Sequence, residues 1–301
     1  MKQRELEQKT RKIFHKIHAA QGDEPEIFDR LTSLLSCKYL KEKKDFFYNK
    51  ICLDVGCGSN ANATLSMLRM GAKKVYAVDL DKSILETAPR LLSGFEGRYV
   101  LDVGNVLDLD YEGDFFDFVL CAGVLHHTAD ALRGMKELAR VTKKGGCLYI
   151  TIQGKGGLMK EITNLLRDKY AKDTQFKELI DGLDKSHFLE LWRWLNGIMR
   201  EHDDTMAANI PESCIKELFN KDLVYTIQDR ITAPRYDEFT ESEIVDWLRD
   251  NSFIKITRLT RYPSIKNIRR FLCPFYYKYD HRFSRILYGD GHIQIKATKV
   301  R

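Results

Sequence analysis

Hydrophobic residues along this chain alternate between two kinds of pattern from residue 51 to residue 152. The first is the short apolar run typical of a buried strand, found at residues 51–55, 74–78, 98–103, 116–122 and 147–152. The second is apolar spacing typical of a helix, found between those runs at residues 65–70, 83–92 and 130–142. Strands and helices that alternate in this way predict an α/β fold, with a parallel sheet covered by helices on both faces.

The pattern changes on either side of this region. Residues 1–50 and residues 155–230 have helical spacing and no strand-like alternation. A capping box, Thr240-Glu241-Ser242-Glu243, predicts the start of another helix. Two further strands are expected, at residues 254–262 and 293–300. We therefore expect four parts: an N-terminal helical segment (1–50), an α/β core (51–154), a helical insertion (155–230), and the rest of the core with a long basic loop (231–301).

The composition is that of a globular protein and argues against a membrane-spanning or disulfide-rich one. The 301 residues are 44% hydrophobic, which supports a sizeable core. The longest apolar run, residues 118–125, is too short to cross a bilayer, and the first residues predict no signal peptide. Seven cysteines without a C-x-x-C pair predict reduced thiols in a cytoplasmic protein, with neither a disulfide framework nor a zinc site.

The net charge of +6 comes from the end of the chain. Residues 251–301 carry 12 Lys and Arg against 2 Asp and Glu, so the rest of the chain has a net charge of −4. This segment also contains many aromatic residues, and it is a candidate surface for an anionic partner. A solvated basic face is the ordinary alternative.

A glycine loop, Gly56-Cys57-Gly58, follows the first strand. Glycines between a strand and a helix let a ligand approach the backbone closely, and taken alone they fit a dinucleotide site equally well. Asp54, two residues before the loop, would repel a pyrophosphate and favour a cation. Asp79 ends the second strand, where a carboxylate can hold two ribose hydroxyls.

The third strand is followed by Asn105 and Val106. The Asn105 side chain can accept from an adenine amino group, and the next amide can donate to the ring. A ligand with an adenosine, a positive charge and no phosphate is S-adenosyl-L-methionine (SAM).

These motifs resemble the class I SAM-dependent methyltransferases, and in particular the group of ubiquinone and menaquinone biosynthesis methyltransferases. The resemblance rests on residues 53–58, 78–80, 104–106, 116–127 and 138–150. It implies a Rossmann-like, doubly wound sheet of seven strands, the last one antiparallel, with SAM as cofactor. The implied cofactor-binding residues are Asp54, Gly56, Cys57, Gly58, Asp79, Leu80, Asn105, Val106 and Cys121. The chain departs from the family at Asn105, where Asp is more common, and lacks the third glycine of some members.

The end of the fourth strand is expected to face the reactive methyl group, and it carries His126 and His127. Histidine is the usual general base for an alcohol or phenol, so either residue is a candidate catalytic base. The alternative is that both histidines only pack beside the cofactor. The motifs for methylation of nucleic-acid nitrogen, cytosine carbon 5 and protein arginine are absent from this strand end, and no carboxylate cluster predicts a metal site.

Gln153, Arg235 and Tyr236 are the candidate acceptor-binding residues. Gln153 ends the fifth strand, Arg235 can pair with an anion, and Tyr236 can line the pocket. The leading hypothesis is metal-independent O- or N-methylation of a small molecule, in which residues 51–154 bind SAM, residues 1–50 form a lid and the insertion at 155–230 caps the acceptor. Two alternatives stay open: an RNA-modifying methyltransferase that uses the basic segment, and a non-catalytic SAM-binding partner subunit. The sequence predicts neither the acceptor nor the oligomeric state.

Overall fold

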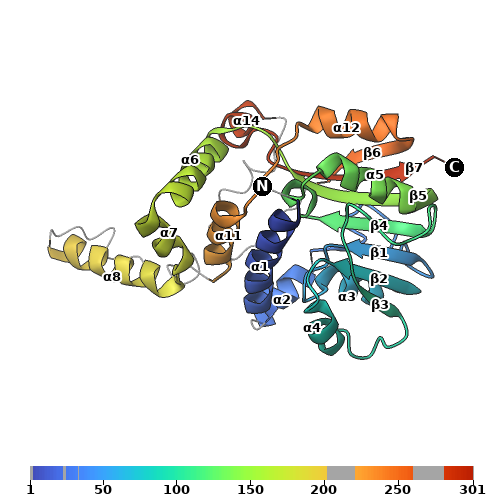
Figure 1. Cartoon of the computed structure of the whole chain (residues 1–301), viewed down its shortest axis with the longest axis horizontal. Coiled ribbons are helices and arrows are strands. Elements are labelled where there is room, and N and C mark those ends of the chain that lie inside the picture. The colour runs from blue at the N-terminus through green and yellow to red at the C-terminus, as the bar shows by residue number, and fades with distance from the viewer. Residues whose placement is uncertain (1–2, 23–24, 33, 202–220, 260–280, 301) are drawn as a thin grey trace. The chain divides into compact units, whose positions relative to one another are not determined.

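The computed structural model describes residues 3–22, 25–32, 34–201, 221–259 and 281–300 (Figure 1). The chain divides into two compact units. The core unit comprises residues 1–156, 234–261 and 289–301, and the helical unit comprises residues 157–233 and 262–288.

A seven-stranded sheet forms the centre of the core unit (Figure 1). Its strands are β1 (Ile51–Val55), β2 (Lys74–Asp79), β3 (Tyr99–Val103), β4 (Phe116–Ala122), β5 (Thr142–Gln153), β6 (Phe253–Arg258) and β7 (His292–Lys299). The spatial order is β3-β2-β1-β4-β5-β7-β6. The first five strands pair in parallel, and β7 lies antiparallel between β5 and β6. The predicted fold class and the antiparallel last strand are therefore confirmed.

The fifth strand begins earlier than the sequence predicts. The strand was predicted at residues 147–152, and β5 also includes residues 142–146 and Gln153. Thr142 pairs with Phe116 and Cys147 pairs with Phe118, so four residues of β5 lie opposite one residue of β4. This bulge leaves no room for a side chain at Gly146, where a Cβ atom would lie 3.0 Å from the Phe116 carbonyl oxygen.

Helices cover both faces of the sheet. One face packs against α5 (Ala131–Val141) and α12 (Glu241–Asp250), with Leu53 and Val119 in the shared core. The other face packs against α3 (Asn62–Arg69) and α4 (Ile84–Leu91). Because strand residues point alternately to the two faces, the near-continuous apolar runs of the sequence follow from this double cover.

Helix α12 begins as its capping box predicts. The Thr240 hydroxyl accepts from the Glu243 backbone N–H at 3.2 Å, and the Glu243 carboxylate accepts from the Thr240 N–H. Two N-terminal helices, α1 (Gln3–Gly22) and α2 (Pro25–Thr32), precede the sheet.

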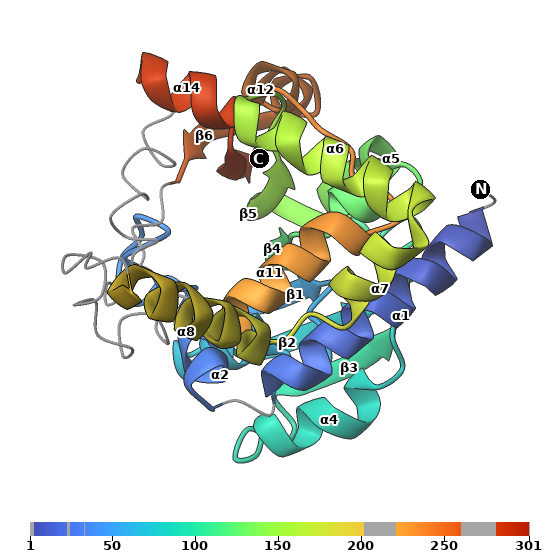
Figure 2. The same cartoon turned by 90° about the vertical axis from the view of Figure 1, so that its left-hand side faces the viewer.

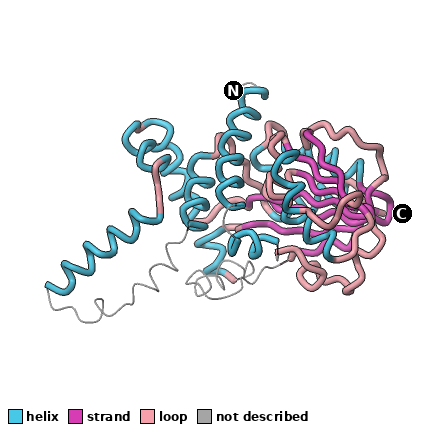
Figure 3. Tube along the Cα trace, turned by 90° about the horizontal axis from the view of Figure 1, so that it is seen from below, coloured by secondary structure: helices cyan, strands magenta, loops and turns pink. Residues whose placement is uncertain are grey.

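The helical unit contains α6 (Leu158–Lys172), α7 (Thr174–Asp181), α8 (Lys185–Glu201), α11 (Lys221–Thr232) and α14 (Arg282–Tyr288). Helix α11 packs against α6 and α7, and α14 packs against α6 (Figure 2). The Gln228 side chain donates to the Ile180 carbonyl at 3.1 Å. All regular structure described in this unit is helical (Figure 3), and α14 occupies part of the segment expected as a loop between the last two strands. Residues 202–220 of the helical insertion predicted at 155–230 lie outside the described residues.

Within the described part of the chain, no helix combines the length and the apolar composition needed to cross a membrane.

Candidate cofactor and acceptor site

The glycine loop lies where β1, β2 and β4 end. Gly56 and Gly58 both have positive φ, at 71° and 66°, and the Gly56 N–H donates to the Val78 carbonyl at 2.7 Å. A Cβ atom on Gly56 would overlap Cγ2 of Val124, the residue that precedes the 3-10 turn η1 (Leu125–His127). The loop therefore runs directly against the segment that carries the two candidate catalytic histidines.

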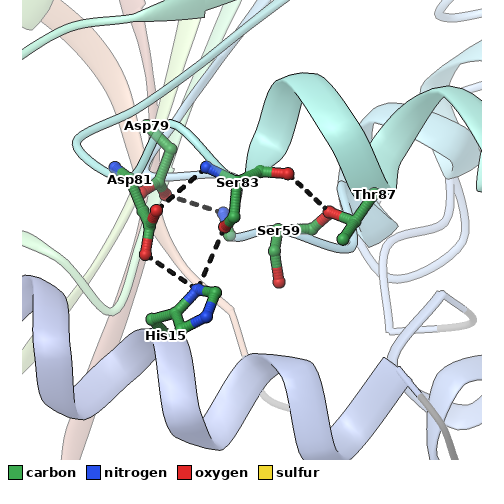
Figure 4. A network of polar contacts seen from close by, with 7 residues as sticks. His15, Ser59, Asp79, Asp81, Ser83 and Thr87 are labelled. Carbon is green, nitrogen blue, oxygen red and sulfur yellow. Dashed lines mark hydrogen bonds and ion pairs between the residues drawn. The ribbon is translucent and has the colours of Figure 1, made fainter.

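The Asp79 carboxylate is oriented by two backbone amides at the end of β2. Its Oδ2 accepts from the Gly58 N–H at 2.8 Å, and its Oδ1 accepts from the Asp81 N–H at 2.9 Å (Figure 4). Each carboxylate oxygen has a second lone pair. The geometry therefore suits a carboxylate that accepts from two neighbouring ribose hydroxyls.

The Asp54 side chain is buried near the end of β1, two residues before the glycine loop. Its Oδ2 accepts from the Thr64 hydroxyl at 2.7 Å, and its carboxylate also accepts from the Thr64 backbone N–H. Thr64 lies in the first turn of α3, whose N-cap residue Ala61 provides no side-chain cap, so Asp54 takes over that role. The pKa of Asp54 is raised to about 7, because burial and, to a smaller extent, the neighbouring Asp79 carboxylate outweigh the Thr64 hydrogen bonds that lower it.

Asn105 is held in one orientation by two hydrogen bonds. Its Nδ2 donates to Oε1 of Glu7 at 2.8 Å, and its Oδ1 accepts from the Leu107 N–H at 3.0 Å. In the described part of the structure, the backbone N–H of Val106 has no acceptor. That amide fits the predicted donor to the adenine ring.

The cysteines near the site differ in burial. Cys57 is half-buried in the loop, and Cys121 is fully buried in β4. Burial raises the pKa of both thiols above the ordinary value of 9.0, so both stay protonated at neutral pH. Leu80 is half-buried at the end of β2. Their predicted cofactor contacts stay predictions.

An orphaned hydroxyl lies in the same loop. The Ser59 side chain is 3% exposed, and within the described ranges of the chain its Oγ has no hydrogen-bond partner. Figure 4 shows this side chain between Thr87 of α4 and His15 of α1. A buried hydroxyl without a partner is costly, which fits a site where a polar ligand such as SAM completes the hydrogen bonding.

His126 and His127 are buried at the end of β4. Their ring centroids lie 4.1 Å apart, and each lies 5.0 Å from the ring of Tyr236. His127 Nδ1 is 2.8 Å from the Arg235 carbonyl oxygen. Since a carbonyl only accepts, this bond places the proton on Nδ1 and leaves the Nε2 lone pair as the basic atom.

The structure brings the three candidate acceptor residues to these histidines. The Tyr236 hydroxyl donates to Oε1 of Gln153 at 3.1 Å. The Arg235 guanidinium pairs with Asp237, with Nε 3.0 Å from both carboxylate oxygens. The Asp237 N–H in turn donates to the His126 carbonyl at 2.8 Å. The backbone carbonyl of Arg235 thus orients His127, and the Arg235 guanidinium is paired with Asp237.

Helix α1 provides a part of the site that no sequence motif predicted. Glu7 binds Asn105, and the Phe14 ring lies 4.8 Å from the His127 ring. His15 Nδ1 is 2.9 Å from Oδ2 of Asp81 (Figure 4). The sequence predicted these residues only as part of a helix, because no local pattern indicates where an N-terminal helix packs. Of the segment 251–301, the candidate surface for an anionic partner, residues 260–280 lie outside the described residues.

Residues 53–150 match the model of a family described as a methyltransferase domain. An uncharacterised protein of Methanocaldococcus jannaschii is 31% identical over 135 residues, which cover 45% of this chain and 52% of that protein. The demethylmenaquinone methyltransferase of Bacillus pumilus is 29% identical over 154 residues (48% and 62%). The ubiquinone biosynthesis O-methyltransferase of Proteus mirabilis is 31% identical over 119 residues (39% and 47%). The chain thus spans roughly half the length of the curated relatives it matches.

A solved structure agrees with these matches at the level of the fold. It is the complex between the Haloferax volcanii Trm112 methyltransferase activator and a protein described as a methyltransferase, with a TM-score of 0.52 and 12% identity. The match covers 97% of this chain and 98% of the other. The resemblance drawn from the sequence motifs, to a class I SAM-dependent methyltransferase, is confirmed for the domain at residues 53–150.

Proposed function

We propose that this chain, whose residues 53–150 form a class I SAM-dependent methyltransferase domain, transfers a methyl group from SAM to a small-molecule acceptor. One observation carries the proposal: the glycine loop contacts the histidine segment directly through Gly56 and Val124. Cofactor-binding and candidate proton-accepting groups therefore share one site within the core unit.

The cofactor would supply a methyl group on a positively charged sulfur. Asp79 accepts from the ribose hydroxyls, the Val106 N–H donates to the adenine ring, and the loop at Gly56 and Gly58 gives the methionine part close access to the backbone. The buried Asp54 carboxyl below the loop offers negative charge when it ionises, and a cationic ligand favours that ionisation.

His127 is the better placed of the two candidate bases. Its Nδ1–H is fixed by the Arg235 carbonyl, so Nε2 can take a proton from an acceptor hydroxyl or amine as the methyl group is transferred. Phe14 and Tyr236 flank its ring, and their apolar surfaces exclude water from the reacting atoms.

The Tyr236 and Gln153 side chains would line the acceptor. Their hydrogen bond fixes the tyrosine ring against both histidines, so a planar acceptor could pack on the exposed part of that ring. O-methylation and N-methylation both suit this arrangement, and metal independence, the capping role of the helical unit and the cytoplasmic location stay predictions. The named quinone-biosynthesis relatives make phenols and quinols the first acceptors to test.

The direct test uses purified protein with methyl-labelled SAM and a panel of phenols, quinols, alcohols and amines. We expect calorimetric binding of SAM and of S-adenosyl-L-homocysteine (SAH), no binding of NAD, and label transfer to at least one panel class. Asp79→Asn should weaken SAM binding by about 10-fold to 100-fold, because a charge-assisted hydrogen bond contributes about 1.5–3 kcal/mol. Binding of NAD without binding of SAM would refute the proposal.

A further inference from the structure

Helix α1 contacts residues that follow the carboxyl ends of three strands of the sheet, β3, β2 and β4. Glu7 contacts Asn105 after β3, His15 contacts Asp81 after β2, and Phe14 contacts His127 after β4. With 3.6 residues per turn, positions 7 and 14 fall on the same side of the helix and position 15 lies beside them. One face of α1 is therefore turned toward the edge of the sheet that holds the cofactor residues.

The Glu7 carboxylate is positioned with one oxygen to spare. Its Oε1 accepts from Asn105 Nδ2 and from Gln3 Nε2, both at 2.8 Å. Its Oε2 makes no hydrogen bond within the described part of the chain. The Asn105 Oδ1 already accepts from the Leu107 N–H. The Glu7 carboxylate is therefore the stronger acceptor beside Asn105, and it has an oxygen available.

Adenine sets a requirement at this position. The Val106 N–H is the donor proposed for a ring nitrogen, and the exocyclic amino group sits beside that nitrogen on the same edge of the base. The acceptor for the amino group must therefore lie next to Val106. Asn105 is the adjacent residue, and Glu7 is hydrogen-bonded to it.

We infer that Glu7 accepts the adenine amino group of the bound cofactor, so that α1 is a wall of the cofactor site and selects adenosine over inosine. This inference rests on the proposed function. In inosine a carbonyl oxygen replaces the amino group, and a carboxylate repels a carbonyl oxygen at hydrogen-bond distance.

A second observation on α1 supports a ligand on the same face. Thr10 lies three residues after Glu7 and four before Phe14, and its buried Oγ1 has no hydrogen-bond partner among the residues that the structure describes. The Ser59 Oγ in the glycine loop has the same status. Two orphaned buried hydroxyls, one on the helix and one on the loop, fit a polar ligand that contacts both.

The test is calorimetry with two ligands, SAH and its inosine analogue S-inosyl-L-homocysteine. The full-length protein should bind SAH at least 10-fold more tightly than the analogue. Glu7→Ala should weaken SAH binding by about 10-fold to 100-fold, the range for loss of a hydrogen bond to a charged group. Glu7→Gln keeps the side-chain volume and adds an N–H that can donate to the inosine carbonyl, so this variant should bring the two affinities together.

Glu5→Gln is the matched control, because it removes the same charge from an exposed position of α1 that pairs with Lys9. It should leave both affinities unchanged. Equal binding of SAH and the analogue by the unaltered protein would overturn the inference without any variant. An equal loss for both ligands in Glu7→Gln would also overturn it, since that result indicates only a structural role for α1. Failure of the unaltered protein to bind SAM or SAH would refute the proposed function itself.

Discussion

Gly56 and Val124 are in such close contact that no side chain fits between them. A Cβ atom on Gly56 would overlap Cγ2 of Val124 and would lie 3.3 Å from its Cβ and Cγ1. Gly56 also has a φ of 71°, a conformation that residues with a side chain rarely adopt. Two features therefore require glycine at position 56: the positive φ of its backbone, and the close approach of the segment that carries the histidines.

Substitution of Gly56 tests this relationship. Gly56→Ala should lower the free energy of unfolding by roughly 2–5 kcal/mol, since backbone strain and overpacking each contribute about 1–3 kcal/mol. Val124→Ala in the same chain removes Cγ2 and should restore part of that loss, leaving the strain of the positive φ. Urea denaturation of the two single variants and the double variant gives the interaction energy, and strictly additive effects would contradict the contact.

The base role of His127 predicts a selective loss of turnover. His127→Asn should lower kcat by roughly 10²–10⁴-fold, the usual contribution of a general base, while SAM affinity stays within a few-fold of the original. His126→Asn is the matched control, because His126 lies beside the same tyrosine ring without the Arg235 hydrogen bond that fixes the tautomer. If both variants keep near-normal turnover, the histidines serve packing alone.

The raised pKa of Asp54 predicts a specific pH dependence of stability. Burial lifts this pKa from 3.8 to about 7, so between these values the folded protein holds a proton that the unfolded chain releases. The Asp54 contribution to stability is therefore complete below about pH 4 and is lost as the pH rises through about 7. Asp54→Asn should remove this component, measured as a flatter dependence of urea midpoints on pH from 4 to 8.

The same carboxyl should couple cofactor binding to pH. A positively charged ligand favours ionised Asp54, so SAM should bind more tightly as the pH rises from 5 to 8, with proton release below pH 7. Calorimetry in two buffers of different ionisation enthalpy measures the released proton. No proton release in this range, with SAM still bound, would show that Asp54 does not sense the ligand.

The capping box of α12 offers a stability prediction away from the cofactor. Thr240→Ala removes the hydroxyl that accepts from the Glu243 N–H, and it should lower the free energy of unfolding by about 0.5–2 kcal/mol. SAM affinity should not change, because Thr240 contacts none of the proposed cofactor residues. Thr240→Ser keeps the hydroxyl and should retain most of the stability in the same thermal or urea denaturation.

The sequence by itself determined the central sheet and the cofactor motifs. Strand β1 was predicted with both ends as observed, and Asp79 was predicted at the end of its strand, because buried runs and strand-end glycines are local signals. The α12 capping box is equally local, since its two hydrogen bonds join residues three apart in the chain. Strand runs and capping boxes can be predicted from short stretches of sequence, because the residues that form them are close together in the chain.

Only the tertiary structure decided which side chains meet at the site. Glu7 and Asn105 are 98 residues apart, and His127 and Arg235 are 108 apart, so no local pattern relates them. Asp54 was predicted beside the glycine loop, and only the structure shows that its carboxylate also accepts from Thr64 in the first turn of α3. The physical reason is that these contacts depend on tertiary packing. The surface on which a helix docks, and the burial that raises the pKa of a carboxyl, exist only once the chain has folded.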